Sequence, residues 1–172
     1  MKIKVPIMKF EYDMWSFYME VDAQTATPFI QGKDRRITWE FADENPFHAA
    51  LMPKKGVYSI YITSEFMKKN AIEPGDTIEI ELEKDTSEFG IEMPESFSAL
   101  LDQDQEGAMY FLELSKGQQR SLLHIVGKVK NVDSQISKGM AIMQHLKETC
   151  GTLDFKRLNE LIKEFNQQRK SF

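Results

Sequence analysis

The sequence predicts an α+β protein, with strands in the first half of the chain and helices in the second. Two observations carry this prediction. Apolar and polar residues alternate in short runs up to about Asp85, whereas apolar residues after Pro94 recur every three to four positions. The chain has 172 residues, 41% of them hydrophobic, which suffices for one globular domain or two small ones. We therefore predict a β-domain over residues 1–92 and a helical region over residues 93–172.

Alternating runs mark the expected strands of the first half. They lie at Phe10–Val21, Arg35–Phe41, Phe47–Leu51, Val57–Ile62 and Thr77–Asp85, and the first run predicts either one strand or two paired strands. A turn is expected before the last strand, where Pro74 fixes φ and Gly75 can adopt positive φ. A short helix over Glu65–Asn70, with Ser64 as its N-cap, is expected between the last two strands.

Helix signals dominate the second half. Short helices are expected around Phe97–Leu101 and around Met109–Leu114. Three longer helices follow, one N-capped by Ser115, one beginning near Ser134 and one N-capped by Asp154. The apolar residues that lie at helical spacing in these three are Leu122, Leu123, Ile125, Val126, Val129, Ile136, Met140, Met143, Leu146, Phe155, Leu158, Leu161, Ile162 and Phe165.

The net charge of −5 is unevenly distributed. Residues 1–100 carry 11 Lys and Arg against 18 Asp and Glu, whereas residues 101–172 carry 11 against 9. An acidic first half argues against a protein whose affinity comes from wrapping nucleic-acid phosphates. The basic excess after Ser115 indicates either solvated helix faces or contact with an acidic partner, a nucleic acid or the acidic β-domain. Within it, we expect Arg120, Lys128 and Lys130 to contact a partner or an anion.

Targeting and cross-linking signals are weak. No apolar run approaches the roughly 18–20 residues that a membrane-spanning helix needs. The N-terminal segment mixes charges into its apolar residues, unlike a signal peptide. Cys150 is the one cysteine, so no intrachain disulfide is expected. We expect a cytoplasmic protein.

One segment follows the order strand, short helix, Pro-Gly-Asp turn, strand. It spans Gly56–Asp85, with the turn at residues 74–76. This layout resembles the swapped-hairpin barrel of AbrB-like proteins, and the resemblance implies a double-split β-barrel. Swapped hairpins need two chains, so a monomer and a dimer both stay open.

A longer span, from about Phe10 to Glu148, resembles the bacterial YdeI or OmpD-associated (bacteriocin-protection) family joined to its barrel domain. The shared features are an aromatic strand, a proline before a glycine-containing strand, a Gly-Asp turn, a Pro before a short helix, a Phe-x-x-Leu-Ser stretch and a further helix. In this sequence they lie at Trp15–Tyr18, Pro53, Gly56, Gly75–Asp76, Met93–Pro94, Ala99–Leu100, Phe111–Ser115 and Arg120–Ile125. The resemblance implies a barrel capped by helices, and no settled biochemical activity.

The chain departs from this family after that last helix. Members usually carry an acidic-Thr-Arg sequence that leads to further arginines, whereas here the stretch from Lys128 to Ile136 contains no arginine. Lys128 and Ile136 themselves are retained. A guanidinium offers a fixed fork of donors that asparagine and glutamine lack, so an anion-binding role of those arginines does not carry over to this chain.

Motifs for catalysis, metals and cofactors are missing from the sequence. His48, His124 and His145 have no partner at the HExxH or CxxC spacing of metal sites. No serine lies in a Gly-x-Ser-x-Gly elbow, and no glycine-rich phosphate loop occurs. We expect no enzymatic activity, no metal and no cofactor. An enzyme, the less favoured alternative, would need Asp43 or Glu44 beside His48 for acid–base chemistry.

Aromatic residues crowd the predicted strands. Alternate strand faces would bury many of them, but their number exceeds what a small barrel core requires. We predict that a ligand-binding groove is lined by Trp15, Phe17, Tyr18, Trp39 and Tyr58. The sequence thus favours a non-enzymatic binding protein for a small apolar or peptide ligand or for a protein partner. A nucleic-acid-binding regulator, by analogy with AbrB-like barrels, is the alternative.

Overall fold

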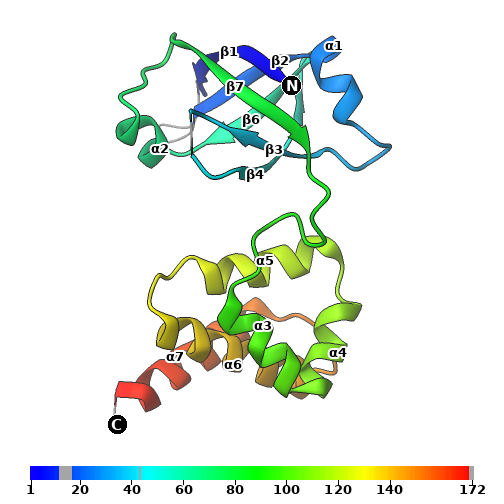
Figure 1. Ribbon diagram of the computed structural model, residues 1–172. Coiled ribbons are helices and arrows are strands. Elements are labelled where there is room, and N and C mark those ends of the chain that lie inside the picture. Colours follow the sequence, from blue (N-terminus) through cyan, green and yellow to red (C-terminus); the bar gives the residue numbers. More distant parts are fainter. Residues whose placement is uncertain (12–16, 43, 171–172) are drawn as a thin grey trace. The chain divides into compact units, whose positions relative to one another are not determined.

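All described strands of the computed structural model lie in one unit, Met1–Gly90, and the long helices lie in a second, Ile91–Phe172 (Figure 1). The structure describes residues 1–11, 17–42 and 44–170, with side chains up to residue 167. The predicted α+β class is confirmed, because strands precede long helices along the chain. The change of unit falls between Gly90 and Ile91, and the sequence-based boundary was placed after residue 92.

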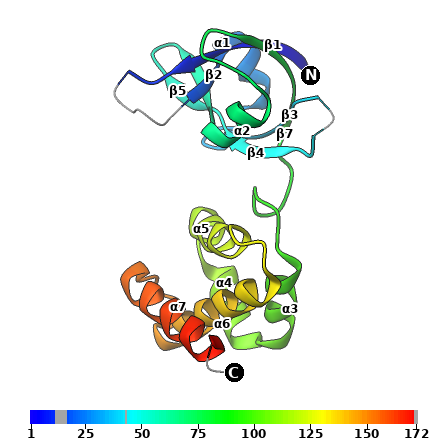
Figure 2. The same ribbon diagram turned by 90° about the vertical axis from the view of Figure 1, so that its left-hand side faces the viewer.

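The first unit is a nearly closed antiparallel barrel. Its strands are β1 (Lys2–Lys9), β2 (Phe17–Asp22), β3 (Arg36–Glu40), β4 (Phe47–Ala50), β5 (Met52–Lys54), β6 (Val57–Ile62) and β7 (Thr77–Lys84), in the sheet order β4-β3-β7-β1-β2-β6-β5. The two outermost strands, β4 and β5, are joined by Leu51 alone, so the two edges of the sheet must meet. The Leu51 side chain is fully buried. The strands therefore curve around one core, as Figure 2 shows.

Strand β1 pairs with one neighbouring strand along its first part and with another along its second part. Its residues from Lys2 to Pro6 pair with β7, and those from Ile7 to Lys9 pair with β2. The inward-facing Val5 and Ile7 are 1% and 0% exposed, which matches the period-two pattern of a half-buried strand. Because β1 closes hydrogen bonds on both sides, it joins the two sets of strands into one sheet.

The barrel core is rich in aromatic contacts at one end. Trp39 stacks on Phe47 with 4.5 Å between ring centroids and meets the edge of Phe66 at 5.1 Å. Phe66 comes from the short helix α2 (Ser64–Lys69), which also buries Met67. The N-cap of α2 is Thr63, whose Oγ1 accepts the Phe66 N–H at 3.1 Å, so the prediction of Ser64 as N-cap is wrong by one residue.

Three elements of the barrel differ from the expected ones. Strand β1 is not among the expected strands, although its Lys-Ile-Lys-Val pattern alternates. Strand β5 contains Pro53, a residue that predicts a loop in the sequence. It lies on an edge strand, where the missing backbone N–H of proline is tolerated. The residues after β2 form α1 (Ala23–Ala26), capped by Asp22, and a single 3-10 turn (Thr27–Phe29).

In the second unit, the other helices pack around α6. The helices are α3 (Glu95–Gln103), α4 (Gln105–Glu113), α5 (Lys116–Gly127), α6 (Val132–Glu148) and α7 (Phe155–Lys170). Helix α6 contacts each of the other four (Figure 1). The predicted caps Ser115 and Asp154 are confirmed. Ser115 forms a capping box with Gln118, and Asp154 accepts the N–H groups of Lys156 and Arg157.

Gly139 allows α3 to approach α6 closely. A Cβ built on Gly139 would collide with the Leu100 side chain and would lie 3.1 Å from Cδ2 of Phe97. Phe97 is fully buried and packs edge-on against Phe111 of α4, with the ring centroids 5.3 Å apart. The small residue on α6 thus makes room for the aromatic core of this unit.

His145 ties α6 to the start of α7. It is 0% exposed, and its Nε2 accepts the Asp154 N–H at 3.0 Å. Burial lowers the pKa of His145 below its usual value, against the opposing attraction of Asp154 and Glu148. The imidazole is therefore neutral at pH 7, as an acceptor nitrogen requires.

We predict that Gly139→Ala lowers the free energy of unfolding of the helical unit by about 1–3 kcal/mol, the usual cost of forcing extra volume into a packed core. Urea unfolding followed by helical circular dichroism measures this. Gly117→Ala is the matched control, because a Cβ at Gly117 meets nothing within 4 Å. An equal loss of stability in both variants would contradict the packing argument.

We also predict that acid destabilises the helical unit through His145. The folded pKa lies below the unfolded value of about 6.5, so the stability from neutral His145 is complete above that pH. It is lost as the pH falls, by up to about 1.4 kcal/mol per pH unit between the two pKa values. Unfolding at about pH 7.5 and about pH 5.5 should show this loss in the wild type. In His145→Gln, this pH-dependent loss of stability should disappear. The control His124→Gln, which changes an exposed histidine, should show the same loss as the wild type.

Candidate functional site

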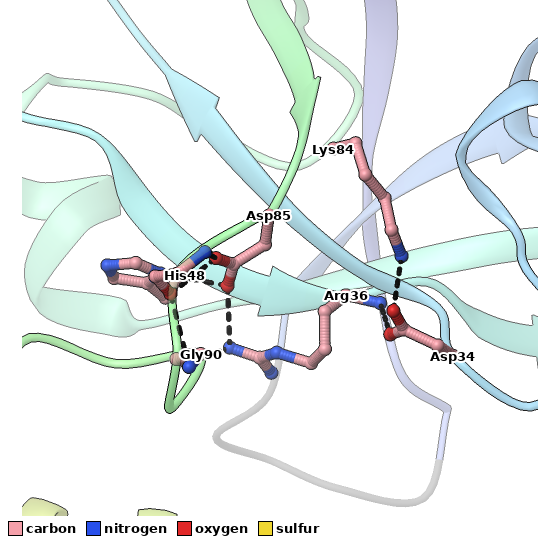
Figure 3. Close-up of polar contacts among 7 residues, drawn as sticks. Asp34, Arg36, His48, Lys84, Asp85 and Gly90 are labelled. Atoms are coloured by element: carbon pink, nitrogen blue, oxygen red, sulfur yellow. Dashed lines mark hydrogen bonds and ion pairs between the residues drawn. The ribbon is translucent and has the colours of Figure 1, made fainter.

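A buried carboxylate organises the polar residues at one end of the barrel (Figure 3). The Asp85 side chain is 1% exposed and accepts hydrogen bonds from His48 Nδ1 at 2.9 Å and from the Ser87 N–H at 3.0 Å. The Arg36 guanidinium lies 3.7 Å from the same carboxylate and also donates to the Gly90 carbonyl. Burial alone would raise the pKa of Asp85, but the hydrogen bonds from Ser87 and His48 outweigh it and hold the pKa below its usual value.

This cluster fastens a loop to the barrel. An ionised Asp85 only accepts, so the His48 Nδ1 carries the proton and the other ring nitrogen turns away from Asp85, as Figure 3 shows. The Ser87 N–H donates to Asp85, and the Gly90 carbonyl accepts from Arg36. These two hydrogen bonds hold the segment that follows β7 against the barrel. A histidine oriented by an aspartate is also an arrangement that acid–base catalysis uses.

The carboxylate that meets His48 is not one of those expected. The partners expected from the sequence are Asp43 and Glu44. Asp43 lies outside the described residues, and Glu44 instead pairs with Lys69 at 2.8 Å. Asp85 is separated from His48 by 37 positions and meets it because β3 lies between β4 and β7 in the sheet. Sequence spacing offers no signal for such a contact.

The predicted aromatic groove residues do not share one surface. Trp39 is 3% exposed inside the barrel core, and Phe17 and Tyr58 pack partly buried against that core. The Tyr18 ring is covered by Lys54, whose Nζ lies 3.5 Å from the ring centroid. Trp15 lies outside the described residues. Trp39 and Tyr18 are both buried, at 3% and 4% exposed, and the ligand-binding roles of all five residues stay predictions.

Phe17 does border a hollow of the barrel. A groove of about 430 Å³ lies between the start of β2, helix α2 and the loop that ends at Pro74. Its apolar lining consists of Phe17, Met67, Ala71, Ile72 and Pro74. This groove contains one of the five predicted aromatic residues, so it is not the aromatic site that the sequence suggested.

A larger cleft lies within the helical unit, with a volume of about 550 Å³. Three segments form its walls: the entry into α3, the last turns of α5, and the first turn of α6. Its apolar lining consists of Ile91, Met93, Pro94, Leu123 and Val132, together with Gly127. Its polar lining consists of Glu92, Glu95, Ser96, His124, Lys128 and Gln135.

Hydrogen bonds hold the walls of this cleft in place. The Ser96 hydroxyl donates to Gln135 Oε1 at 2.8 Å, and Gln135 Nε2 donates to the Val129 carbonyl at 2.8 Å. Gln135 thus connects α3, α6 and the loop between α5 and α6. Pro94, the N-cap residue of α3, lies close enough to Gly127 that a Cβ there would be 3.6 Å from its ring. The cleft is therefore built from connected parts rather than from loose side chains.

One of the three predicted contact residues reaches the cleft. Lys128 lines it, whereas Arg120 and Lys130 are not among its lining residues. Glu95, His124 and Gln135 also line the cleft, although no sequence pattern assigns them to a binding site. These residues are brought together by helix packing, and no local motif marks them.

Two further properties concern the described part of the chain. Among the described residues, no cluster of three or more His, Cys, Asp or Glu side chains is arranged to hold a metal ion. None of the helices described is both long and apolar enough to cross a membrane.

The fold and the cleft define an α+β protein in which a β-barrel is followed by a helical unit with a lined cavity. Residues 90–149 match the protein-family model described as OmdA: bacteriocin-protection, YdeI or OmpD-associated. The resemblance to that family is thereby confirmed for this part of the chain, and every residue that lines the cleft falls within it. No curated protein and no solved structure matches the chain. The AbrB-like resemblance of the barrel stays a prediction.

We predict that Asp85→Asn lowers the free energy of unfolding of the barrel by about 1–3 kcal/mol, because the neutral amide is a weaker acceptor for the buried partners His48 and Ser87 than the carboxylate is. The contribution of Asp85 is present above its unfolded pKa of about 3.9 and is lost as the pH falls through the lower folded pKa. Tryptophan fluorescence during urea unfolding reports on the barrel, since Trp39 lies in its core. Asp34→Asn is the control. Its exposed pair with Lys84 should contribute at most about 1 kcal/mol, so an equal loss in both variants would contradict the assignment.

Proposed function

We propose that this is a non-enzymatic binding protein whose helical unit holds a small apolar or peptide ligand, or a segment of a partner protein, in the cleft between α3, α5 and α6. The observation that carries the proposal is the cleft itself. Its volume of about 550 Å³ falls within the roughly 300–1,000 Å³ typical of ligand sites. It lies wholly within the residues that match the family model, so the cleft is a feature of the family-related part of the chain.

The lining suits a ligand with both apolar and polar groups. Met93, Pro94 and Val132 offer apolar contacts, while Ser96 and Gln135 lie beside them. A peptide combines apolar side chains with backbone donors and acceptors, and therefore complements such a mixed surface.

The polar groups of the cleft support binding rather than catalysis. The Ser96 hydroxyl donates to an amide oxygen of Gln135, and an amide is no base for activating a nucleophile. His124 is exposed at the end of α5, and no hydrogen bond joins it to a carboxylate among the described residues. A nucleophile and base within reach of each other, which acyl or group transfer requires, are thus not assembled in the described cleft.

We extend the proposal to the location of the protein. A chain with one cysteine forms no internal disulfide and needs no oxidising compartment. We therefore propose that it works in the cytoplasm.

The proposal is tested by thermal stability of the full chain against apolar metabolites, short peptides and oligonucleotides at low and moderate salt. A ligand at a hundred times its Kd adds about 2.7 kcal/mol, which shifts Tm by several degrees. Val132→Phe should abolish the shift by filling the cleft, because Val132 is 57% exposed and lines it. Met140→Phe is the control on the same helix, exposed and outside the cleft lining.

Three results would contradict the proposal. A shift that survives in Val132→Phe places the ligand elsewhere. A shift with oligonucleotide alone that vanishes as salt rises favours the nucleic-acid alternative. No shift with any compound, together with equal capture of partner proteins by the wild type and Val132→Phe, removes the cleft as the binding site.

A further inference from the structure

We infer that the cleft of the helical unit takes a zwitterionic ligand, a short peptide with free ends and an apolar middle, rather than an uncharged apolar compound or a simple anion. The inference rests on the proposed function, since it names the chemical class of ligand for the same cleft. It follows from how charges and apolar residues are divided among the walls.

One wall of the cleft is acidic. Glu92 and Glu95 both come from the segment that leads into α3, and both are exposed. Neither carboxylate forms an ion pair with a cation among the described residues. They therefore stay available to an ammonium group in the cleft.

Another wall is basic. Lys128 ends α5 and lines the cleft, and its ammonium makes no ion pair with the described carboxylates. It is the one lysine in the described lining of the cleft. This wall therefore offers an exposed, unpaired ammonium that attracts an anionic group.

The opposite charges of the cleft do not neutralise each other. No ion pair joins Lys128 to Glu92 or Glu95 in the described structure, although all three line the same cavity. Apolar residues, among them Met93 and Val132, complete the lining. A ligand with one charge would be attracted by one wall and repelled by the other, whereas a ligand with opposite charged ends satisfies both.

The experiment uses the tripeptides Ala-Leu-Ala and Ala-Phe-Ala in four forms: free, N-acetylated, C-amidated and capped at both ends. Binding to the full chain is measured by titration with backbone amide NMR shifts. We expect the free form to bind most tightly, and each cap to weaken binding about threefold or more, as for a partly exposed ion pair. Rising salt should reduce this preference.

Matched variants assign each end of the peptide to its wall. In Lys128→Gln, amidation of the peptide should no longer weaken binding, while acetylation still should. In the double variant with Glu92→Gln and Glu95→Gln, the reverse pattern is expected. Lys163→Gln is the control, because Lys163 is an exposed lysine of the same unit that does not line the cleft, and it should retain the wild-type pattern.

The outcomes separate this inference from the proposed function. Equal binding of all four forms overturns the zwitterion while leaving the cleft as a peptide site. A loss on amidation alone overturns it in favour of a simple anion site. No binding of any form also overturns it, and the proposed function is then decided by the wider compound panel and by Val132→Phe.

Discussion

The helical unit depends on one constraint, the close packing of the other helices against α6. Gly139 permits the approach of α3, and His145 secures the start of α7 by accepting a backbone hydrogen bond. Gln135, in the first turn of α6, forms hydrogen bonds to α3 and to the loop between α5 and α6, and so holds both in position. The same helix therefore stabilises the core and sets the separation of the walls that form the cleft.

This arrangement explains why charges remain unpaired inside the cleft. Lys128 ends one helix and Glu95 begins another, and packing on α6 holds the two backbones in place. Each charge also suits its own helix, since cations favour the C-terminal end and anions the N-terminal end. Local helix electrostatics and the shape of the unit together leave opposite charges facing one cavity without forming a salt bridge.

In the barrel, burial rather than exposure dominates the aromatic residues. Trp39 fills the core with Phe47 and Phe66, and Tyr18 lies beneath Lys54. The polar cluster around Asp85 has a comparable structural role, because its hydrogen bonds secure the segment that leaves β7. The functional proposals accordingly rest on the cleft of the helical unit, which lies within the residues 90–149 that match the family model.

The sequence by itself determined the class of fold, the alternating strands such as β7 and the capped helices such as α5, because periodicity and capping act between residues a few positions apart. It missed β5, whose Pro53 is tolerated only because that strand lies at an edge of the sheet. It also could not tell that Trp39 would be buried, since a strand's pattern does not say which face meets the core. Only the tertiary structure brought Glu95 and Gln135 into one cleft, because residues forty positions apart meet through helix packing and leave no local signature.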